Sequence, residues 1–277
     1  MRLPLPEPAP GDAAERERIL GRPAILDVQG LEKSFGGIKA VDGLTFSVPQ
    51  GSITGLVGPN GAGKTTAFNL IAGVLKPDGG QIRFLGRRID GLAAHQVAAQ
   101  GILRTFQIPR GLGQMTVLEN LMVVPLAQPG ESLWNVWTRP GRVVDAERSI
   151  RRRAMEVLEF VHLTELKDEL AAHLSGGQKK LLELARTLMG DPVMILLDEP
   201  GAGVNPSLMR DLVRLIGELR DQGKTFLLIE HDMDLVAELC DPVLVMHQGR
   251  LLAQGTLETI RTNPIVVEAY LGGVPTA

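Results

Sequence analysis

The hydrophobic pattern divides the chain into three regions. The first carries short apolar runs separated by glycine-rich turns, and we predict strands at 25–31, 44–48, 52–57, 81–85 and 102–106. Between residues 108 and 189 the apolar residues recur at helical spacing, as in Ile150, Ala154, Val157, Leu158 and Val161. Strand-like runs then return at 193–197, 225–229 and 243–246, with helical segments among them.

The continuous apolar runs indicate an α/β fold. The run at 193–197 has no polar alternation, which is typical of a parallel strand that is covered on both faces. A chain of 277 residues is long enough for one large domain or for one domain with an inserted subdomain. Residues 1–23 are rich in proline, alanine and charge, so we expect a mobile extension there.

Composition and charge narrow the functional classes. The net charge is −3, so no general basic field is present to attract nucleic acid, and Arg151–Arg153 are expected to form a solvated helix face. The single cysteine, Cys240, lies in an apolar pattern and is expected to be a small core residue. No apolar run reaches the roughly 18–20 residues that span a bilayer, and the N-terminus lacks an apolar signal core. We therefore expect a cytoplasmic protein whose membrane role comes through a partner.

A glycine-rich stretch is the first candidate binding site. Residues 58–66 match the pattern of a glycine, four residues, then Gly-Lys-Thr, and they lie between strand 52–57 and a predicted helix. The residues of this stretch are Gly58, Pro59, Asn60, Gly61, Ala62, Gly63, Lys64, Thr65 and Thr66. Glycines leave room for backbone N–H groups to converge on phosphate oxygens, and the helix N-terminus adds roughly +0.5 of a charge. We expect Lys64 to reach the β- and γ-phosphates of a nucleotide and the Thr65 hydroxyl to bind Mg²⁺.

Two acidic residues follow the predicted buried strand 193–197. The carboxyl ends of parallel strands line the nucleotide crevice of such sheets, so Asp198 is expected to hold Mg²⁺ through water. Glu199 is expected to polarise the attacking water. Burying a carboxylate is costly unless a cation or hydrogen-bond donors offset the desolvation, which favours a functional interpretation of this pair.

A second phosphate-binding surface is predicted at Leu174–Gln178. Ser175 and Gln178 have the spacing of a capping box, and Gly176 and Gly177 lie in the first turn, where helix propensity disfavours glycine. A helix N-terminus with accessible N–H groups and a serine hydroxyl suits a phosphate. Two phosphate-binding surfaces on one chain predict a dimer in which each nucleotide lies between the first surface of one subunit and the second surface of the other.

In this order the motifs resemble those of ATP-binding-cassette ATPases. The phosphate loop is followed by Leu174–Gln178, Ile195–Glu199 and a single histidine, His231. The resemblance covers residues 24–272, with a tail at 273–277. It implies a P-loop NTPase core with a parallel-rich sheet, an N-terminal antiparallel β subdomain and an α-helical subdomain inserted at about 108–189. It also implies ATP and Mg²⁺ as ligands.

The resemblance assigns roles to further residues. Gln107 resembles the switch residue that contacts Mg²⁺ and the helical subdomain, and His231 resembles the sensor of the γ-phosphate. Phe35 lies where the family stacks an aromatic ring on adenine, and core packing is the alternative role for that ring. Asn205 stands where many members carry an aspartate, so an ionic contact is not expected there.

Within the family, the chain is most similar to the ATPase subunits of branched-chain amino-acid importers. The similarity lies in Arg104–Gln107, Met115–Leu121, Gly201–Pro206 and Val267–Gly272. It implies an ATPase on the cytoplasmic face of the inner membrane, with a second ATPase subunit, permease subunits and a separate substrate-binding protein as partners.

Several alternatives remain open at this point. Urea and amide importers and the lipopolysaccharide-export ATPase share parts of these segments. A cassette that acts on nucleic acid and a regulatory subunit without turnover are the less favoured alternatives. Residues 128–143 depart from the expected pattern, and their Trp134 and Trp137 are expected either to face a membrane subunit or to form a satellite core.

Overall fold

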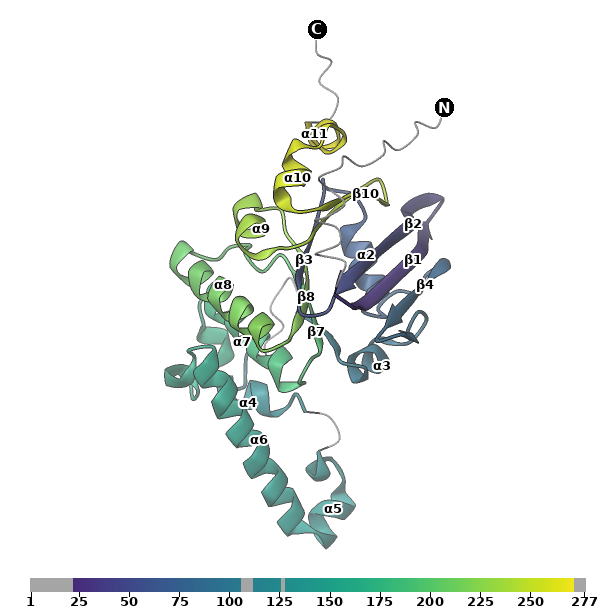
Figure 1. The fold of residues 1–277 in the computed structure, drawn as a ribbon. Coiled ribbons are helices and arrows are strands. Elements are labelled where there is room, and N and C mark those ends of the chain that lie inside the picture. Colours follow the sequence, from purple (N-terminus) through teal and green to yellow (C-terminus); the bar gives the residue numbers. More distant parts are fainter. Residues whose placement is uncertain (1–21, 106–111, 126–127, 272–277) are drawn as a thin grey trace. The chain divides into compact units, whose positions relative to one another are not determined.

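The computed structural model describes residues 22–105, 112–125 and 128–271. These residues form two compact units, drawn together in Figure 1 and described separately below. The first unit comprises the chain up to residue 100 and from residue 220 onward, and the second comprises residues 101–219. Because the chain returns to the first unit, the second unit is an insertion in it.

An antiparallel sheet forms one layer of the first unit. Its strand order is β2-β1-β4-β5, with β1 (Ala24–Phe35), β2 (Ile38–Pro49), β4 (Gly79–Phe84) and β5 (Arg87–Arg88). Gly36 and Gly37 both have positive φ, which allows a two-residue hairpin between β1 and β2. This hairpin makes both strands longer than the apolar runs alone predict.

A parallel-rich sheet forms the second layer of the first unit. It contains β3 (Ile53–Val57), β8 (Thr225–Ile229), β9 (Val243–His247) and β10 (Arg250–Gly255), in the order β10-β9-β3-β8. β3 is parallel to β8 and β9, whereas β10 is antiparallel to β9. All residues of β3 and β8 are buried, as expected for strands covered on both faces.

Five helices lie in the described part of the first unit. They are α2 (Lys64–Ile71), α3 (Ala94–Ala99), α9 (Met233–Leu239), α10 (Leu257–Thr262) and α11 (Pro264–Leu271). α2 lies between the two sheets, and its Phe68 is fully buried (Figure 1). The sheets are also joined directly, because the N–H of Asp42 donates to the carbonyl of Gly249 and the Asp42 carboxylate pairs with Arg250.

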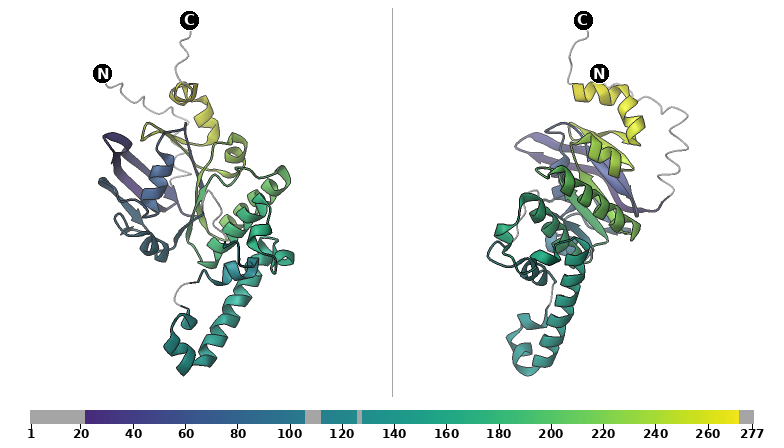
Figure 2. Two further views of the ribbon diagram at one scale, coloured as in Figure 1. Left: turned by 180° about the vertical axis from the view of Figure 1, so that it is seen from behind. Right: turned by 90° about the vertical axis from the view of Figure 1, so that its left-hand side faces the viewer.

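The second unit is mainly helical. Its two strands, β6 (Ile102–Arg104) and β7 (Met194–Asp198), are parallel. Its helices are α4 (Val117–Met122), α5 (Leu133–Thr138), α6 (Pro140–Phe160), α7 (Gly176–Met189) and α8 (Pro206–Asp221), with 3₁₀ turns at Pro129–Glu131, Thr164–Leu166 and Ala171–His173. α4, α6 and α7 pack against one another, whereas α5 packs beside the first turns of α6 (Figure 2).

The main sequence predictions agree with this architecture. The α/β class, the parallel-rich sheet, the antiparallel sheet and the helical insertion are confirmed. Arg151–Arg153 are exposed on α6, and Asn205 caps α8 by accepting from the N–H of Leu208 at 2.9 Å. Cys240 is buried, and burial together with the negative charge of Glu230 raises the pKa of its thiol to about 12.

Some predictions fall outside the described residues or beyond what they test. The predicted extension lies almost entirely in residues 1–21, and Gln107 lies in 106–111, so the structure describes neither. The domain boundaries proposed from the sequence therefore stay predictions. None of the described helices has both the length and the apolar character that a bilayer crossing requires.

Candidate functional site

The phosphate loop lies in the first unit, between the end of β3 at Val57 and the start of α2 at Lys64. Gly63 is the N-cap residue of α2, with φ at 99°, and no side chain caps this end of the helix. No acidic residue lies in the first turn of α2. The positive end of the helix dipole is therefore not offset locally, which suits an anionic ligand.

Two glycines of the loop are required by its packing. A Cβ atom at Gly58 would overlap the carbonyl oxygen of Met246, and one at Gly63 would overlap the carbonyl oxygen of Ala40. Gly61 meets nothing within 4 Å, so only its φ of 80° favours glycine there. From the sequence, all three glycines are expected to leave space for a phosphate. At Gly58 and Gly63 the close approach of a neighbouring carbonyl oxygen is a second reason for glycine.

The Lys64 side chain is held within the loop. Its Nζ donates to the carbonyl oxygens of Gly58 at 2.7 Å and Pro59 at 3.0 Å, so the charge stays close to the glycine-rich turn. Thr65, next along the chain, is exposed in the first turn of α2. The loop thus presents a cation and a hydroxyl group at one end of one helix.

His231 also lies in the first unit, two residues after the end of β8. Its side chain is 66% exposed, whereas the neighbouring Glu230 side chain is 1% exposed. The Glu230 Oε2 accepts from the N–H of His231 at 3.0 Å and lies 3.7 Å from its Nδ1. Asp232 caps α9 by accepting from the N–H of Asp234. Two side chains therefore fix the backbone on either side of an accessible imidazole.

Glu230 was not among the residues predicted from the sequence. The signal was present, because Glu230 directly follows the buried strand 225–229 just as Asp198 directly follows the apolar run 193–197. The two carboxylates differ in what offsets their buried charge. The backbone N–H groups of residues 231 and 232 donate to Glu230, whereas the side chain of Arg104 donates to Asp198.

Phe35 ends β1 with 46% of its surface exposed. The Nζ of Lys33 lies 5.7 Å from the centre of the Phe35 ring, a distance suited to a cation–π contact. Core packing of this ring, the alternative drawn from the sequence, is therefore wrong. The ring is accessible for stacking, and its contact with adenine stays a prediction.

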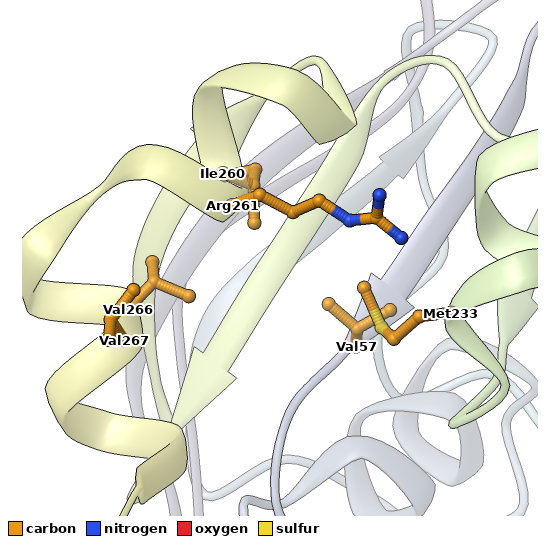
Figure 3. Close-up of a pocket in the computed structure, with 6 residues that line it drawn as sticks. All are labelled: Val57, Met233, Ile260, Arg261, Val266 and Val267. Atoms are coloured by element: carbon orange, nitrogen blue, oxygen red, sulfur yellow. The ribbon is translucent and has the colours of Figure 1, made fainter.

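A separate apolar cavity of about 220 Å³ lies close to the phosphate loop in the first unit. Its lining residues are Val57, Met233, Ile260, Arg261, Val266 and Val267 (Figure 3). Arg261 is the one charged residue in this lining. A triphosphate needs many convergent donors, so this cavity does not suit the phosphates.

Asp198 lies at the end of β7 in the second unit and is 4% exposed. Its Oδ2 accepts from the Nη2 of Arg104 at 2.6 Å, so an arginine at the end of the neighbouring parallel strand β6 offsets its charge. The sequence indicates Arg104 only as part of a segment similar to the family. Its contact with Asp198 cannot be predicted without knowing that β6 and β7 are neighbouring strands.

Glu199 follows Asp198 with a left-handed backbone, φ 49°. The carbonyl oxygens of Glu199 and Pro200 both accept from the Nζ of Lys180, at 2.8 and 2.9 Å. Lys180 belongs to α7, so the helix that begins at Gly176 is tied directly to the peptide that carries Glu199. No pattern in the sequence indicated this contact.

The predicted capping box at the start of α7 is confirmed. The N–H of Gln178 donates to the Ser175 Oγ at 3.3 Å, and the N–H of Ser175 donates to the Gln178 Oε1 at 2.9 Å. The two glycines between them differ. A Cβ atom at Gly177 would overlap the Leu208 side chain of α8, whereas one at Gly176 would meet nothing within 4 Å. Only Gly176 is thus open for a ligand on its side-chain face.

The predicted site residues divide between the two units. The phosphate loop, Phe35 and His231 belong to the first unit, and Ser175–Gln178, Asp198 and Glu199 belong to the second. Trp134 and Trp137 are 74% and 88% exposed, so the satellite core considered for them is wrong. Among the described residues there is no group of three or more His, Cys, Asp or Glu side chains that could hold a metal ion.

Comparison with known proteins decides the family. The family model described as ABC transporter matches residues 41–202. The high-affinity branched-chain amino acid transport ATP-binding protein BraF of Pseudomonas aeruginosa is 43% identical over 91% of this chain and 99% of its own length. The chain belongs to the ABC transporter family. It is an ATP-binding cassette, and cassettes of this family hydrolyse ATP to drive transport.

Further relatives agree with this membership. The high-affinity branched-chain amino acid transport ATP-binding protein LivG of Escherichia coli is 42% identical over 90% of this chain and 98% of its own. A nucleotide-free ATP-binding cassette of an ABC transporter superposes with a TM-score of 0.79 and 40% identity, over 91% of this chain and 100% of its own. A cassette in its ADP conformation gives 0.78 and 39% over the same shares. A second family model, for branched-chain amino acid ATP-binding cassette transporters, matches residues 250–275.

The two glycines of α7 give a paired prediction for this cassette. Gly177→Ala should melt at a lower temperature than Gly176→Ala, because Leu208 must move only for the methyl group at Gly177, whereas the helix preference of alanine, up to about 1 kcal/mol, applies to both. Gly176→Ala should nevertheless lower ATP turnover if its open face receives a phosphate. Thermal denaturation and phosphate release check both variants. Equal melting temperatures would contradict the packing role of Gly177.

Glu230 gives a second prediction as a positioning residue for His231. If His231 acts in the reaction, Glu230→Gln should lower kcat about fivefold with little change in KM, since a hydrogen bond to a charged acceptor is stronger than one to a neutral acceptor by about 1 kcal/mol. Phosphate release over a range of ATP concentrations measures both constants. Glu238→Gln, an exposed change on α9, is the matched control. A folded Glu230→Gln protein with the kcat of the parent would rule out this role.

Proposed function

We propose that this cassette energises the import of branched-chain or related amino acids. It would act at the cytoplasmic face of the inner membrane with a second ATPase subunit, permease subunits and a separate substrate-binding protein. The match of residues 250–275 to the branched-chain model carries the proposal. The nucleotide motifs do not discriminate among substrates, because ABC transporters in general share them, whereas the model that matches this segment is described for branched-chain amino acid transporters. The names of the relatives support the same substrate class.

In this proposal each ATP lies between two subunits. Lys64 and the N–H groups of the loop bind its phosphates on one side, and Phe35 stacks on its adenine. Ser175 and the first turn of α7 of the partner bind the γ-phosphate on the other side. Two facts support this division: no side chain caps α2, whose Thr65 is exposed, and Gly176 of α7 is exposed and leaves its side-chain face open.

The hydrolytic step needs a base and stabilisation of charge. The Glu199 carboxylate orients a water and accepts its proton as the water oxygen attacks the γ-phosphorus in line with the bond to ADP, which then breaks. Lys64 and the exposed imidazole of His231 stabilise the charge that develops on the phosphoryl oxygens. Lys180 holds the peptide that carries Glu199 and so helps to orient it.

Residues of the two units carry oxygen atoms of the kind that a magnesium ion shared with the nucleotide would take. Mg²⁺ takes oxygen ligands and is usually held by one or two carboxylates together with substrate phosphates. Thr65 and Asp198 offer such oxygens, and Gln107 is proposed as a further ligand. When bound, the ion would neutralise charge on the β- and γ-phosphates.

Coupling to the permease follows from the same arrangement. Two ATP molecules close the dimer, and we propose that Gln107 passes this closure to the helical unit and to the membrane partner. Hydrolysis removes the anion that joins the two surfaces, and the dimer opens. Because Arg104 lies three residues before Gln107 and pairs with Asp198, the end of β6 is already tied to the catalytic strand.

Reconstitution with the permease and substrate-binding protein tests the transported class. Leucine should accumulate in proteoliposomes that contain MgATP on the cassette side, and an excess of isoleucine or valine should compete with it. Urea should not compete.

A matched pair of variants makes the reconstitution decisive. Glu199→Gln should bind ATP but abolish both hydrolysis and uptake, whereas Glu165→Gln, an exposed change in the second unit, should leave both intact. If ATP hydrolysis responds to urea and not to leucine, the amino-acid proposal fails while the ATPase assignment stands.

A further inference from the structure

The second unit exposes aromatic rings that the nucleotide site does not use. Trp134 and Trp137 on α5 are 74% and 88% exposed, and they are the two tryptophans of the whole chain. Residues three apart on a helix share a face, so the two rings form one patch. Tryptophan contributes a large apolar area that is ordinarily well buried, and contiguous exposed apolar area marks an interaction site.

Basic residues adjoin these rings. Arg139 and Arg142 follow α5 directly, and both are exposed. Within the described ranges neither guanidinium forms an ion pair. Residues 128–148, around the rings, hold three arginines and three acidic residues, and one of these acidic residues, Asp145, pairs with Arg148. We call the set Trp134, Trp137, Arg139 and Arg142 the tryptophan surface.

The tryptophan surface lies at one end of a helical hairpin. α5 packs against the 3₁₀ turn Pro129–Glu131 and against α6. The views in Figures 1 and 2 place α5 beside the start of α6, at the end of this hairpin that is farther from α4 and α7. The tryptophan surface is therefore not covered by the other helices of its own unit.

We propose that the tryptophan surface binds the headgroup region of an anionic lipid bilayer. Tryptophan rings favour the membrane–water interface, where an apolar ring and a polar N–H are both satisfied. Arginines beside them are attracted to the negative surface of phosphatidylglycerol or phosphatidylserine. α5 has six residues, far too few to cross a bilayer, so it lies in the interface.

The combination of residues favours lipid over a protein groove. A protein partner would seat each ring in a dry pocket, where an adjoining unpaired arginine would need its own buried carboxylate. A lipid surface satisfies the rings and both guanidinium groups together without matched pockets. The proposal does not depend on which substrate the transporter carries.

The tryptophans themselves report the binding. Because both lie on the tryptophan surface, the whole tryptophan emission of the full chain monitors it. Titration with vesicles of equal parts phosphatidylcholine and phosphatidylglycerol should shift the emission to shorter wavelength. Phosphatidylcholine vesicles should give a much weaker response, and added salt should weaken the response to anionic vesicles. An unchanged spectrum with anionic vesicles would overturn the proposal, as would a shift seen only when permease protein is present.

Variants separate the contributions of charge and rings. Arg139→Gln with Arg142→Gln should weaken partitioning into anionic vesicles about 30-fold. Each basic residue near an anionic surface strengthens binding about fivefold, and the two factors multiply. Arg83→Gln with Arg87→Gln, two exposed arginines of the first unit, is the matched control and should change nothing.

Trp134→Ala with Trp137→Ala should abolish co-sedimentation with vesicles while melting temperature and ATP turnover stay unchanged. Co-sedimentation equal to that of the parent would contradict the proposal.

Discussion

Gathering enough hydrogen-bond donors around a polyanion is the constraint on which the rest of this structure depends. The first unit answers it with a buried strand, a loop in which Gly58 and Gly63 allow close backbone packing, and a helix whose N-terminus no side chain caps. Lys64 adds a cation held by two loop carbonyls. In the second unit Ser175 and Gln178 cap α7 and Gly176 stays open on its side-chain face, where we propose a second phosphate site.

The groups proposed for chemistry are held by neighbours that offset or orient them. Arg104 pairs with Asp198, Lys180 binds the carbonyls beside Glu199, and Glu230 accepts from the backbone of His231. Each contact lies at the end of a buried strand or joins such an end to a helix. Asp198 and Glu230 are buried, where a lone charge is costly, and each has a donor that offsets its charge.

Motifs that act locally could be predicted from the sequence, and contacts between distant segments could not. The strand, glycine-rich loop and helix of residues 53–71 and the capping box of α7 follow from residues a few positions apart, and both formed as expected. The Arg104–Asp198 pair and the packing of Gly177 on Leu208 depend on which strands and helices become neighbours, which hydrophobic periodicity does not state. The exposure of Phe35 and of both tryptophans likewise could not be predicted from the sequence. An aromatic residue can lie either in the core or on a binding surface, and only the folded structure shows which.

The central claim is that nucleotide joins the loop of one subunit to α7 of another. Asn60→Cys combined with Ser175→Cys tests it, since both positions are exposed and the native Cys240 thiol is buried with a raised pKa. With Glu199→Gln to prevent turnover, MgATP should promote a covalent dimer through a short thiol crosslinker, and neither single variant should form it. Failure to form that dimer with MgATP, or equal yield without nucleotide, would contradict the account.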